Sequence, residues 1–230
     1  MASSVHTVFG DAHWTIYPDG SAYLQEHNLL LFADLHIGKG AIFRASGIAV
    51  PAGLHKDAMM RLEAALARNP EAQVVFLGDL FHGVQNAETQ AFREVLKRAP
   101  QDHFTLVLGN HDFHAPDWEE INCVDRMELG PMILVHEPPG SDFDHNIPFD
   151  MDRADQPGHY YVAGHLHPAA ALRGKGRSRL MLPAFYFGDK LAVLPAFGLF
   201  TGRKALDAHG RFYGLAENSI IDLGVNPSKG

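Results

Sequence analysis

Residues 74–82, VVFLGDLFH, place a carboxylate directly after a short apolar run. Four consecutive apolar residues that end at a glycine predict a buried strand, and Gly78 lets the backbone turn tightly before Asp79. In layered α/β folds, functional sites gather at the carboxyl ends of strands. Asp79 is therefore a candidate site residue.

The same pattern occurs four more times in the chain. The apolar runs end in LLLFADLH with Asp34 and His36, TLVLGNHD with Asn110, His111 and Asp112, MILVHEP with His136, and YYVAGHLHP with His165 and His167. One such residue after a strand is usually a turn former, but five strand ends indicate a shared site. Carboxylates, imidazoles and an amide without a thiolate suit borderline-hard divalent ions such as Mn, Fe or Zn.

These five motifs, in this order, resemble the signature of the calcineurin-like binuclear metallophosphoesterases. Three further details, DLHIGK with Lys39, the RASGIAVP stretch and GDLFH with His82, are similar to the DNA-ligase-associated branch of that family. Members of this branch are small bacterial proteins encoded beside DNA-repair genes. The resemblance runs from Asp34 to His167 and implies an α-β-β-α sandwich.

The resemblance also implies a ligand set for two divalent metal ions, with manganese favoured and iron or zinc as alternatives. Asp79 would bridge the ions. The remaining ligands would be Asp34, His36 and His167 for one ion, and Asn110, His136 and His165 for the other. A metal-bridging hydroxide would then attack the phosphodiester in line.

Two further histidines lie beside the predicted ligands. His111 is a candidate general acid whose ring Asp112 would hold in orientation. The alternative for His111 is a purely structural role. His82 is expected at the mouth of the site, either contacting a phosphate oxygen or serving as an ordinary surface-turn histidine.

Basic residues offer candidate contacts to a phosphate-containing substrate. Lys39 and Arg44 lie in the predicted loop 37–51, which forms either a cationic lip over the site or a solvated surface loop. Arg173 and Lys175 belong to the basic cluster ALRGKGRSRL, which is either a strand-tracking hairpin tip or a plain soluble turn.

Composition limits the class of protein. A chain of 230 residues with 46% hydrophobic residues fits one domain, residues 1–230. The net charge of −8 argues against a general polyanion-binding surface, so nucleic-acid affinity would have to be local. One cysteine, no signal-peptide pattern and no long apolar run predict a soluble cytoplasmic protein without a membrane segment. A homodimer stays open.

The order of predicted elements indicates the fold class. Strands are expected at 13–17, 21–25, 28–33, 74–77 and 103–108, with helices at 52–68 and 87–98. Residues 114–125 are predicted to be a polar connector, 132–135 a strand, and 138–157 a long acidic loop that is either functional or a solvated flap. Antiparallel strands are expected at 169–173, 179–187, 191–195 and 211–223. This order predicts an α/β fold with two packed mixed sheets flanked by helices.

The leading functional hypothesis is a Mn-dependent phosphodiesterase, specifically a single-strand DNA endonuclease in bacterial DNA repair. Its DNA substrate, and a functional association with an ATP-dependent DNA ligase and a helicase, come from the branch resemblance alone. One alternative is a phosphodiesterase or phosphomonoesterase acting on small nucleotides such as cyclic nucleotides. A third, of another class, is a catalytically inactive protein-binding scaffold.

Overall fold

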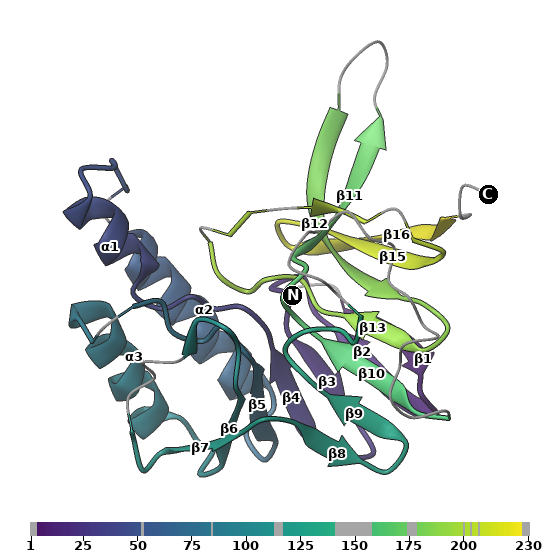
Figure 1. Ribbon diagram of the computed structural model, residues 1–230, viewed down its shortest axis with the longest axis horizontal. Coiled ribbons are helices and arrows are strands. Elements are labelled where there is room, and N and C mark those ends of the chain that lie inside the picture. Colours follow the sequence, from purple (N-terminus) through teal and green to yellow (C-terminus); the bar gives the residue numbers. More distant parts are fainter. Residues whose placement is uncertain are drawn as a thin grey trace.

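Two mixed β-sheets pack face to face, and helices cover the outer face of the first (Figure 1). The computed structural model describes residues 4–51, 53–83, 85–112, 117–140, 158–173, 179–199, 201–202, 204–206 and 208–226. In these ranges the helices are α1 (Lys39–Ala45), α2 (Leu54–Arg68) and α3 (Ala87–Arg98). The predicted sandwich of two mixed sheets with flanking helices is confirmed.

The first sheet has seven strands in chain order. They are β1 (Val5–Phe9), β2 (Ala12–Ile16), β3 (Ala22–Leu24), β4 (Leu29–Phe32), β5 (Gln73–Leu77), β6 (Phe104–Val107) and β7 (Ile121–Val124). The pairs from β1 to β4 are antiparallel and those from β4 to β7 are parallel. The carboxyl ends of β4, β5 and β6 therefore meet at one edge.

The second sheet contains the remaining nine strands. They are β8 (Met127–Leu129), β9 (Met132–Leu134), β10 (Tyr160–Ala163), β11 (Pro168–Arg173), β12 (Arg179–Phe187), β13 (Leu191–Val193), β14 (Lys204–Ala205), β15 (Gly210–Ala216) and β16 (Ser219–Asn226). Strand β10 runs parallel to both β9 and β13, so the ends of β9 and β10 also share an edge. Strands β11 and β12 extend beyond the rest of this sheet (Figure 1).

Strand β4 shows why the first sheet is buried on both faces. Leu29 and Leu31 pack into the core between the sheets, where they join residues such as Leu134 and Phe185. Leu30 and Phe32 point the other way, into the core under the helices. Successive strand side chains alternate between faces, so a continuous apolar run is what a doubly covered strand requires.

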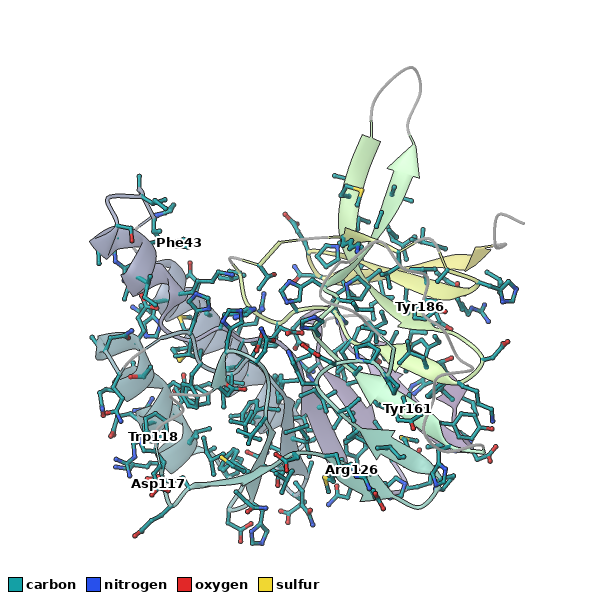
Figure 2. All side chains as sticks on the ribbon, in the orientation of Figure 1. Phe43, Asp117, Trp118, Arg126, Tyr161 and Tyr186 are labelled. Carbon is teal, nitrogen blue, oxygen red and sulfur yellow. The ribbon has the colours of Figure 1, made fainter. Side chains whose placement is uncertain are left out.

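The helices bury the stripes that their sequences predict. In α2, Leu62, Ala65 and Leu66 are buried against the first sheet. Helix α3 begins at Asn86, whose side chain accepts hydrogen bonds from the backbone of Glu88 and Thr89 in a capping box. Figure 2 shows Trp118 on the helical side of the molecule, and Tyr161 and Tyr186 on the second sheet.

Several sequence predictions need correction. The segment 37–51 is not only a loop, because helix α1 occupies its centre. The strand expected at 211–223 is instead two strands, β15 and β16. The connector 114–125 ends in strand β7, and strands β1, β8 and β14 were not predicted. These strands are short and mostly only partly buried, so they lack the apolar run that signals a strand. Residues 141–157 of the predicted acidic loop lie outside the described residues.

Candidate active site

The predicted strand-end residues meet where the two sheets pack together. Asp34, Asp79 and Asn110 follow β4, β5 and β6 of the first sheet. His136 follows β9, and His165 and His167 follow β10 of the second. Ligand atoms of Asp34, His36 and His167 lie within 4.8 Å of one another, as do those of Asp79, His136 and His165. The fold thus brings residues far apart in sequence into two adjoining groups.

Most of these residues have a left-handed backbone, which L-residues with side chains rarely adopt. Eight non-glycine residues have positive φ in the described part of the chain. Five are predicted ligands: Asp34 (φ 52°), His36 (49°), Asp79 (47°), His165 (64°) and His167 (44°). Each such conformation costs about 1–3 kcal/mol and persists only where surrounding contacts enforce it. The concentration of this strain marks the edge as functional.

The first group is deeply buried and short of hydrogen-bond partners. Asp34 has no exposed surface and His36 is 6% exposed. Asp34 Oδ1 and both ring nitrogens of His36 are buried without a hydrogen-bond partner among the described residues. His167 Nε2 lies 3.3 Å from Asp34 Oδ1, while His167 Nδ1 lies 3.2 Å from the carbonyl of Gly202. A buried carboxylate facing imidazole nitrogens fits a cation held between them.

The second group converges on His136 Nε2. This atom lies 3.1 Å from Asn110 Oδ1, 3.2 Å from His165 Nδ1 and 3.4 Å from Asp79 Oδ1. The other ring nitrogen, His136 Nδ1, donates to the carbonyl of Leu77 at 3.0 Å. That bond fixes the tautomer in which Nε2 has a free lone pair, the form in which histidine binds metal.

Asp79 connects the two groups. Its Oδ1 faces His136 of the second group, and its Oδ2 lies 3.9 Å from His36 Nε2 of the first. Oδ1 also accepts a hydrogen bond of 2.9 Å from the backbone N–H of His111. A carboxylate with one oxygen toward each group has the placement that a bridging ligand requires.

Burial and neighbouring charges shift the pKa values of His36 and His167 in opposite directions. Burial, followed by the charge of Lys39, lowers the pKa of His36 to about 2, so its imidazole is neutral. Burial also lowers the pKa of His167, but the adjacent Asp34 carboxylate outweighs this and the net shift is upward. Asp34 therefore attracts a positive charge to this position, which a bound metal ion also supplies.

Glycines allow the strand ends to approach closely. A Cβ on Gly78 would lie 2.2 Å from His136 Nδ1, and one on Gly109 would lie 2.4 Å from the backbone nitrogen of Asp79. A Cβ on Gly164 would lie 2.7 Å from Asp34 Oδ2. Any side chain at these positions would displace a predicted ligand.

His111 and His82 lie together at the mouth of the site. Their ring centroids are 4.7 Å apart, and His111 Nε2 is 3.9 Å from Asp79 Oδ2. The His111 side chain is 44% exposed, so a substrate can reach it. Burial and the neighbouring charges of His111 and Lys39 lower the pKa of His82. Both histidines occupy positions from which they can contact a bound phosphate.

Asp112 was predicted to hold the ring of His111 in orientation, but its hydrogen bonds are made with the backbone. It is buried, and its Oδ1 and Oδ2 accept hydrogen bonds from the backbone N–H groups of Phe81 (3.0 Å) and Gly109 (2.9 Å). No hydrogen bond joins it to the ring of His111 within the described residues, because the two side chains leave the turn toward interior and solvent respectively. Asp112 instead fastens the Asp79 loop to the Asn110 loop.

The four residues predicted as cationic contacts to substrate are Lys39, Arg44, Arg173 and Lys175. Lys39 is close enough to Asp79 and Asp34 for their carboxylates to raise its pKa. Burial lowers the same pKa by more, so the net shift is downward. Arg44 forms an ion pair with the buried Glu88, and its side chain is 46% exposed. Together with His36 and Lys39 it lines a small hollow, and its contact with substrate stays a prediction. Lys175 and the side chain of Arg173 lie outside the described structure.

The larger hollows that adjoin the site had no signal in the sequence. A groove of about 840 Å³ begins at His167, and a second hollow of about 480 Å³ is lined by Asn110 and His136. The supporting carbonyls of Leu77 and Gly202 were also missed, because any residue can supply a backbone carbonyl. Only the three-dimensional packing reveals these features.

Comparison with known proteins gives the class of this chain. Residues 27–226 match the Calcineurin-like phosphoesterase family, and the chain belongs to that family. The protein is a metallophosphoesterase, because both groups of metal-ligating His and Asp residues of the site are present. No curated protein matches the chain.

Solved structures resemble this chain to different degrees. The Pseudomonas putida nuclease MPE is 28% identical, with a TM-score of 0.74, and the match covers 96% of this chain and 100% of that one. A protein of unknown function, AQ665 from Aquifex aeolicus, is 21% identical with a TM-score of 0.43, covering 65% of this chain and 82% of that chain. No described helix is long and apolar enough to cross a membrane.

Proposed function

We propose that the protein is a Mn-dependent phosphodiesterase that cleaves single-stranded DNA. The position of Asp79 carries this proposal, because its two oxygens face imidazoles of different ligand groups. Asp34, His36 and His167 would hold one divalent ion, and Asn110, His136 and His165 the other. When bound, the two ions supply a nucleophilic hydroxide at neutral pH and neutralise charge on the phosphate.

The chain's own residues then orient the phosphate and supply a proton. Lys39, close to both carboxylates, attracts the phosphate, and His82 donates a hydrogen bond to a non-bridging oxygen. His111 gives its proton to the departing alkoxide oxygen. Asp112 holds the loops that carry Asp79 and Asn110 at a fixed spacing. His82 and His111 act on the side of the site that is open to solvent.

Two observations support DNA as the substrate. The similar structure that covers most of this chain is that of a nuclease, and the sequence motifs resemble the DNA-ligase-associated branch, whose members act in bacterial DNA repair. A phosphomonoester dianion would need more cationic contacts than a diester. Of the two predicted cations near the ligands, Arg44 is paired with Glu88, and Lys39 is influenced by the Asp79 and Asp34 carboxylates. A ligase and a helicase remain proposed functional partners.

The test compares two substrates in the presence of manganese: bis-p-nitrophenyl phosphate and circular single-stranded DNA. Nitrophenolate leaves without a proton, whereas a DNA alkoxide requires one. We expect His111→Ala to keep most of the nitrophenyl activity and to lose about 100-fold or more of the DNA cleavage. We expect His82→Ala to lower activity on both substrates, because the non-bridging oxygen that His82 contacts is present in both. His103→Ala serves as the control, because His103 is exposed and lies at the opposite end of β6.

Wild-type protein that cleaves the small diester but leaves DNA intact would overturn the DNA proposal. Cyclic nucleotides would then be tested next. Equal losses on both substrates in the His111 variant would contradict its role as the acid.

A further inference from the structure

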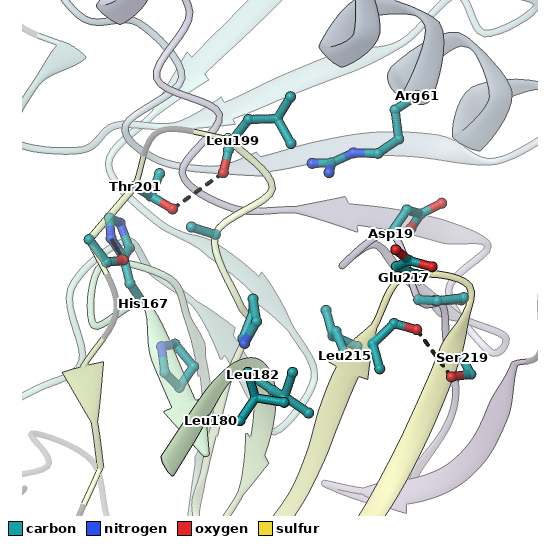
Figure 3. A pocket seen from close by; sticks show the side chains of 17 residues that line it. Asp19, Arg61, His167, Leu180, Leu182, Leu199, Thr201, Leu215, Glu217 and Ser219 are labelled. Carbon is teal, nitrogen blue, oxygen red and sulfur yellow. Dashed lines mark hydrogen bonds between the residues drawn. The ribbon is translucent and has the colours of Figure 1, made fainter. Parts of the chain in front are cut away.

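The groove beside His167 has one apolar wall. It lies between α2, residues 194–199, the β11–β12 pair and the β15–β16 hairpin, and it has a volume of about 840 Å³. Leu180, Leu182, Leu199 and Leu215 line it, and Leu180 and Leu199 are 57% and 41% exposed. Figure 3 shows His167 at one end of the groove, with Leu180, Leu182 and Leu215 on one side and Leu199 on the side of Arg61. Large leucine side chains left in contact with water favour an apolar ligand surface.

The facing wall carries Arg61, whose guanidinium points from α2 toward the centre of the groove (Figure 3). It lies 4.2 Å from the ring of Phe197 and donates a hydrogen bond to the Phe197 carbonyl. Its Nε is buried without a hydrogen-bond partner in the described structure, and burial lowers its pKa. The groove therefore contains a desolvated hydrogen-bond donor with unused capacity.

Arg61 differs from the other arginines whose side chains are described. Each of the others has a carboxylate within 4.0 Å: Arg44, Arg68, Arg93, Arg98, Arg126 and Arg211. Arg61 has none among the described residues. The Asp19 carboxylate acts on Arg61 from farther away and raises its pKa, but less than burial lowers it. A partly buried guanidinium with an unpaired N–H is costly unless a ligand supplies acceptor atoms.

Carboxylates line both hollows, but their cationic neighbours differ. In the groove, Asp19 pairs with Arg68, and Glu217 shares the lining with Arg61. The second hollow is lined by Asp125 and Glu137 beside the predicted ligands Asn110 and His136, and no lysine or arginine lines it in the described residues. A phosphodiester has two substituents that leave the scissile phosphate in different directions. Repulsion by Asp125 and Glu137 disfavours a nucleotide there, so the groove with Arg61 is the better path for one of the two.

We propose that this groove binds the nucleoside next to the scissile phosphate, with the base against Leu180 and with Arg61 donating hydrogen bonds to acceptor atoms of that nucleoside. The inference rests on the proposed phosphodiesterase function and names the part of the substrate that the groove recognises. The volume lies within the range of roughly 300–1,000 Å³ usual for small-molecule sites. A base has an apolar face for the leucines and acceptors on its edge for a guanidinium.

A purely structural role for Arg61 must be separated from this one. Arg61 holds Phe197, and the neighbouring Gly198 donates a backbone hydrogen bond of 3.1 Å to the carbonyl of Asp34. Loss of Arg61 could therefore disturb the metal ligands indirectly. Such a disturbance would lower activity on every substrate, whereas loss of a nucleoside contact would affect only substrates that contain a nucleoside.

The experiment uses substrates with one leaving group. Methyl p-nitrophenyl phosphate lacks a nucleoside, and the p-nitrophenyl esters of thymidine 5′-phosphate and thymidine 3′-phosphate carry one on either side. The variants are Leu180→Glu and Arg61→Met, with Val225→Glu as the control, because Val225 is 56% exposed, much like Leu180, and does not line the groove. Leu180→Glu is expected to fold, because Leu180 is largely exposed.

We expect both groove variants to lower kcat/KM about tenfold or more for one thymidine ester and less than about twofold for the methyl ester. Calorimetric titration with the thymidine monophosphate that matches the affected ester, 5′ or 3′, should show weaker binding to both variants and unchanged binding to Val225→Glu. Equal losses on methyl and thymidine esters, or thymidine binding that neither variant changes, would overturn the inference. A thymidine-selective effect in a protein that leaves DNA intact would reject the DNA substrate but keep the nucleoside site.

Discussion

The two sheets contribute chemically different ligands to the candidate site. The first sheet supplies both carboxylates and the amide, Asp34, Asp79 and Asn110, together with His36. The second sheet supplies imidazoles alone, His136, His165 and His167. The first half therefore carries the buried carboxylates, and the second contributes only imidazole nitrogens. A metal site exists only where the halves pack together.

Direct hydrogen bonds keep the two halves in register. The backbone N–H of His165 donates to Asp34 Oδ2 at 2.9 Å, and His136 Nδ1 donates to the carbonyl of Leu77 at 3.0 Å. The backbone N–H of Gly198 donates a hydrogen bond of 3.1 Å to the backbone carbonyl of Asp34. Each half thus positions ligands of the other, and changes on either side of this junction should have larger effects than changes elsewhere.

The largest effect should come from removing the carboxylate that faces both groups. We expect Asp79→Asn to lower phosphodiesterase activity more than about 100-fold, beyond the 10–100-fold typical of residues that only support ligands, and to reduce the bound manganese. Activity assays and metal analysis of the purified protein would measure this. Asp102→Asn is the control, because Asp102 is exposed at the other end of β6. Full activity in Asp79→Asn would refute the bridging role.

A smaller but general effect should follow from blocking the contact between the halves. In Gly78→Ala the new Cβ would overlap the His136 ring, and an alanine would have to adopt the left-handed backbone of Gly78, with φ 71°. We expect a loss of about 2–4 kcal/mol in the free energy of unfolding, from overpacking and left-handed strain together, and a loss of activity. Gly130→Ala has a similar φ of 60° but no atom within 4 Å, so only the strain should appear. Similar losses in both variants, measured by denaturant unfolding, would contradict the proposed close contact.

Within the first half, Asp112 should matter for stability as well as activity. In wild-type protein the Asp112 carboxylate accepts hydrogen bonds from the backbone N–H groups of Phe81 and Gly109. In Asp112→Asn the side-chain N–H₂ would face one of these two N–H groups, and that hydrogen bond would be lost. The expected cost is about 1–3 kcal/mol in unfolding free energy, with about 10–100-fold weaker metal binding. Urea unfolding and manganese titration would test this. A variant with wild-type stability would show that the two loops keep their spacing without Asp112.

The smallest effect is expected in the second sheet, away from the junction. The hydrogen-bonded ion pair with Arg211 lowers the pKa of Asp222. A lowered folded-state pKa means that the contribution is present above the ordinary pKa of about 3.9 and is lost as the pH falls below it. Because the pair is exposed, Asp222→Asn should cost less than about 1 kcal/mol at pH 7. A cost that stays the same at pH 7 and at pH 3, measured by thermal unfolding, would exclude the ion pair as its source.

The sequence predicted the parts of this comparison that depend on strong local patterns. Apolar runs followed at once by Asp, Asn or His located the strand ends, because a buried strand and the turn after it leave a clear signal. Helix α3 was predicted with its cap, because Asn86 and the apolar stripe act within one segment. The candidate ligands were found for the same reason, and the resemblance of their motifs to a known family divided them between two ions.

The sequence could not predict features that depend on contacts between distant segments. The ion pair of Arg44 with Glu88 joins residues 44 positions apart, and the hydrogen bonds of Asp112 are made with backbone donors. Strand β1 is recognisable only through its pairing with β2, because most of its side chains are exposed or only partly buried. The groove likewise requires α2 and the second sheet to be placed side by side.

The most direct test of the account is a crystal structure of the manganese-loaded protein with anomalous diffraction data. The account predicts two anomalous peaks about 3.5–4 Å apart. Asp79 should lie between them, with Asp34, His36 and His167 at one peak and Asn110, His136 and His165 at the other. A single peak, or two peaks that do not share Asp79, would contradict a binuclear centre assembled from both sheets.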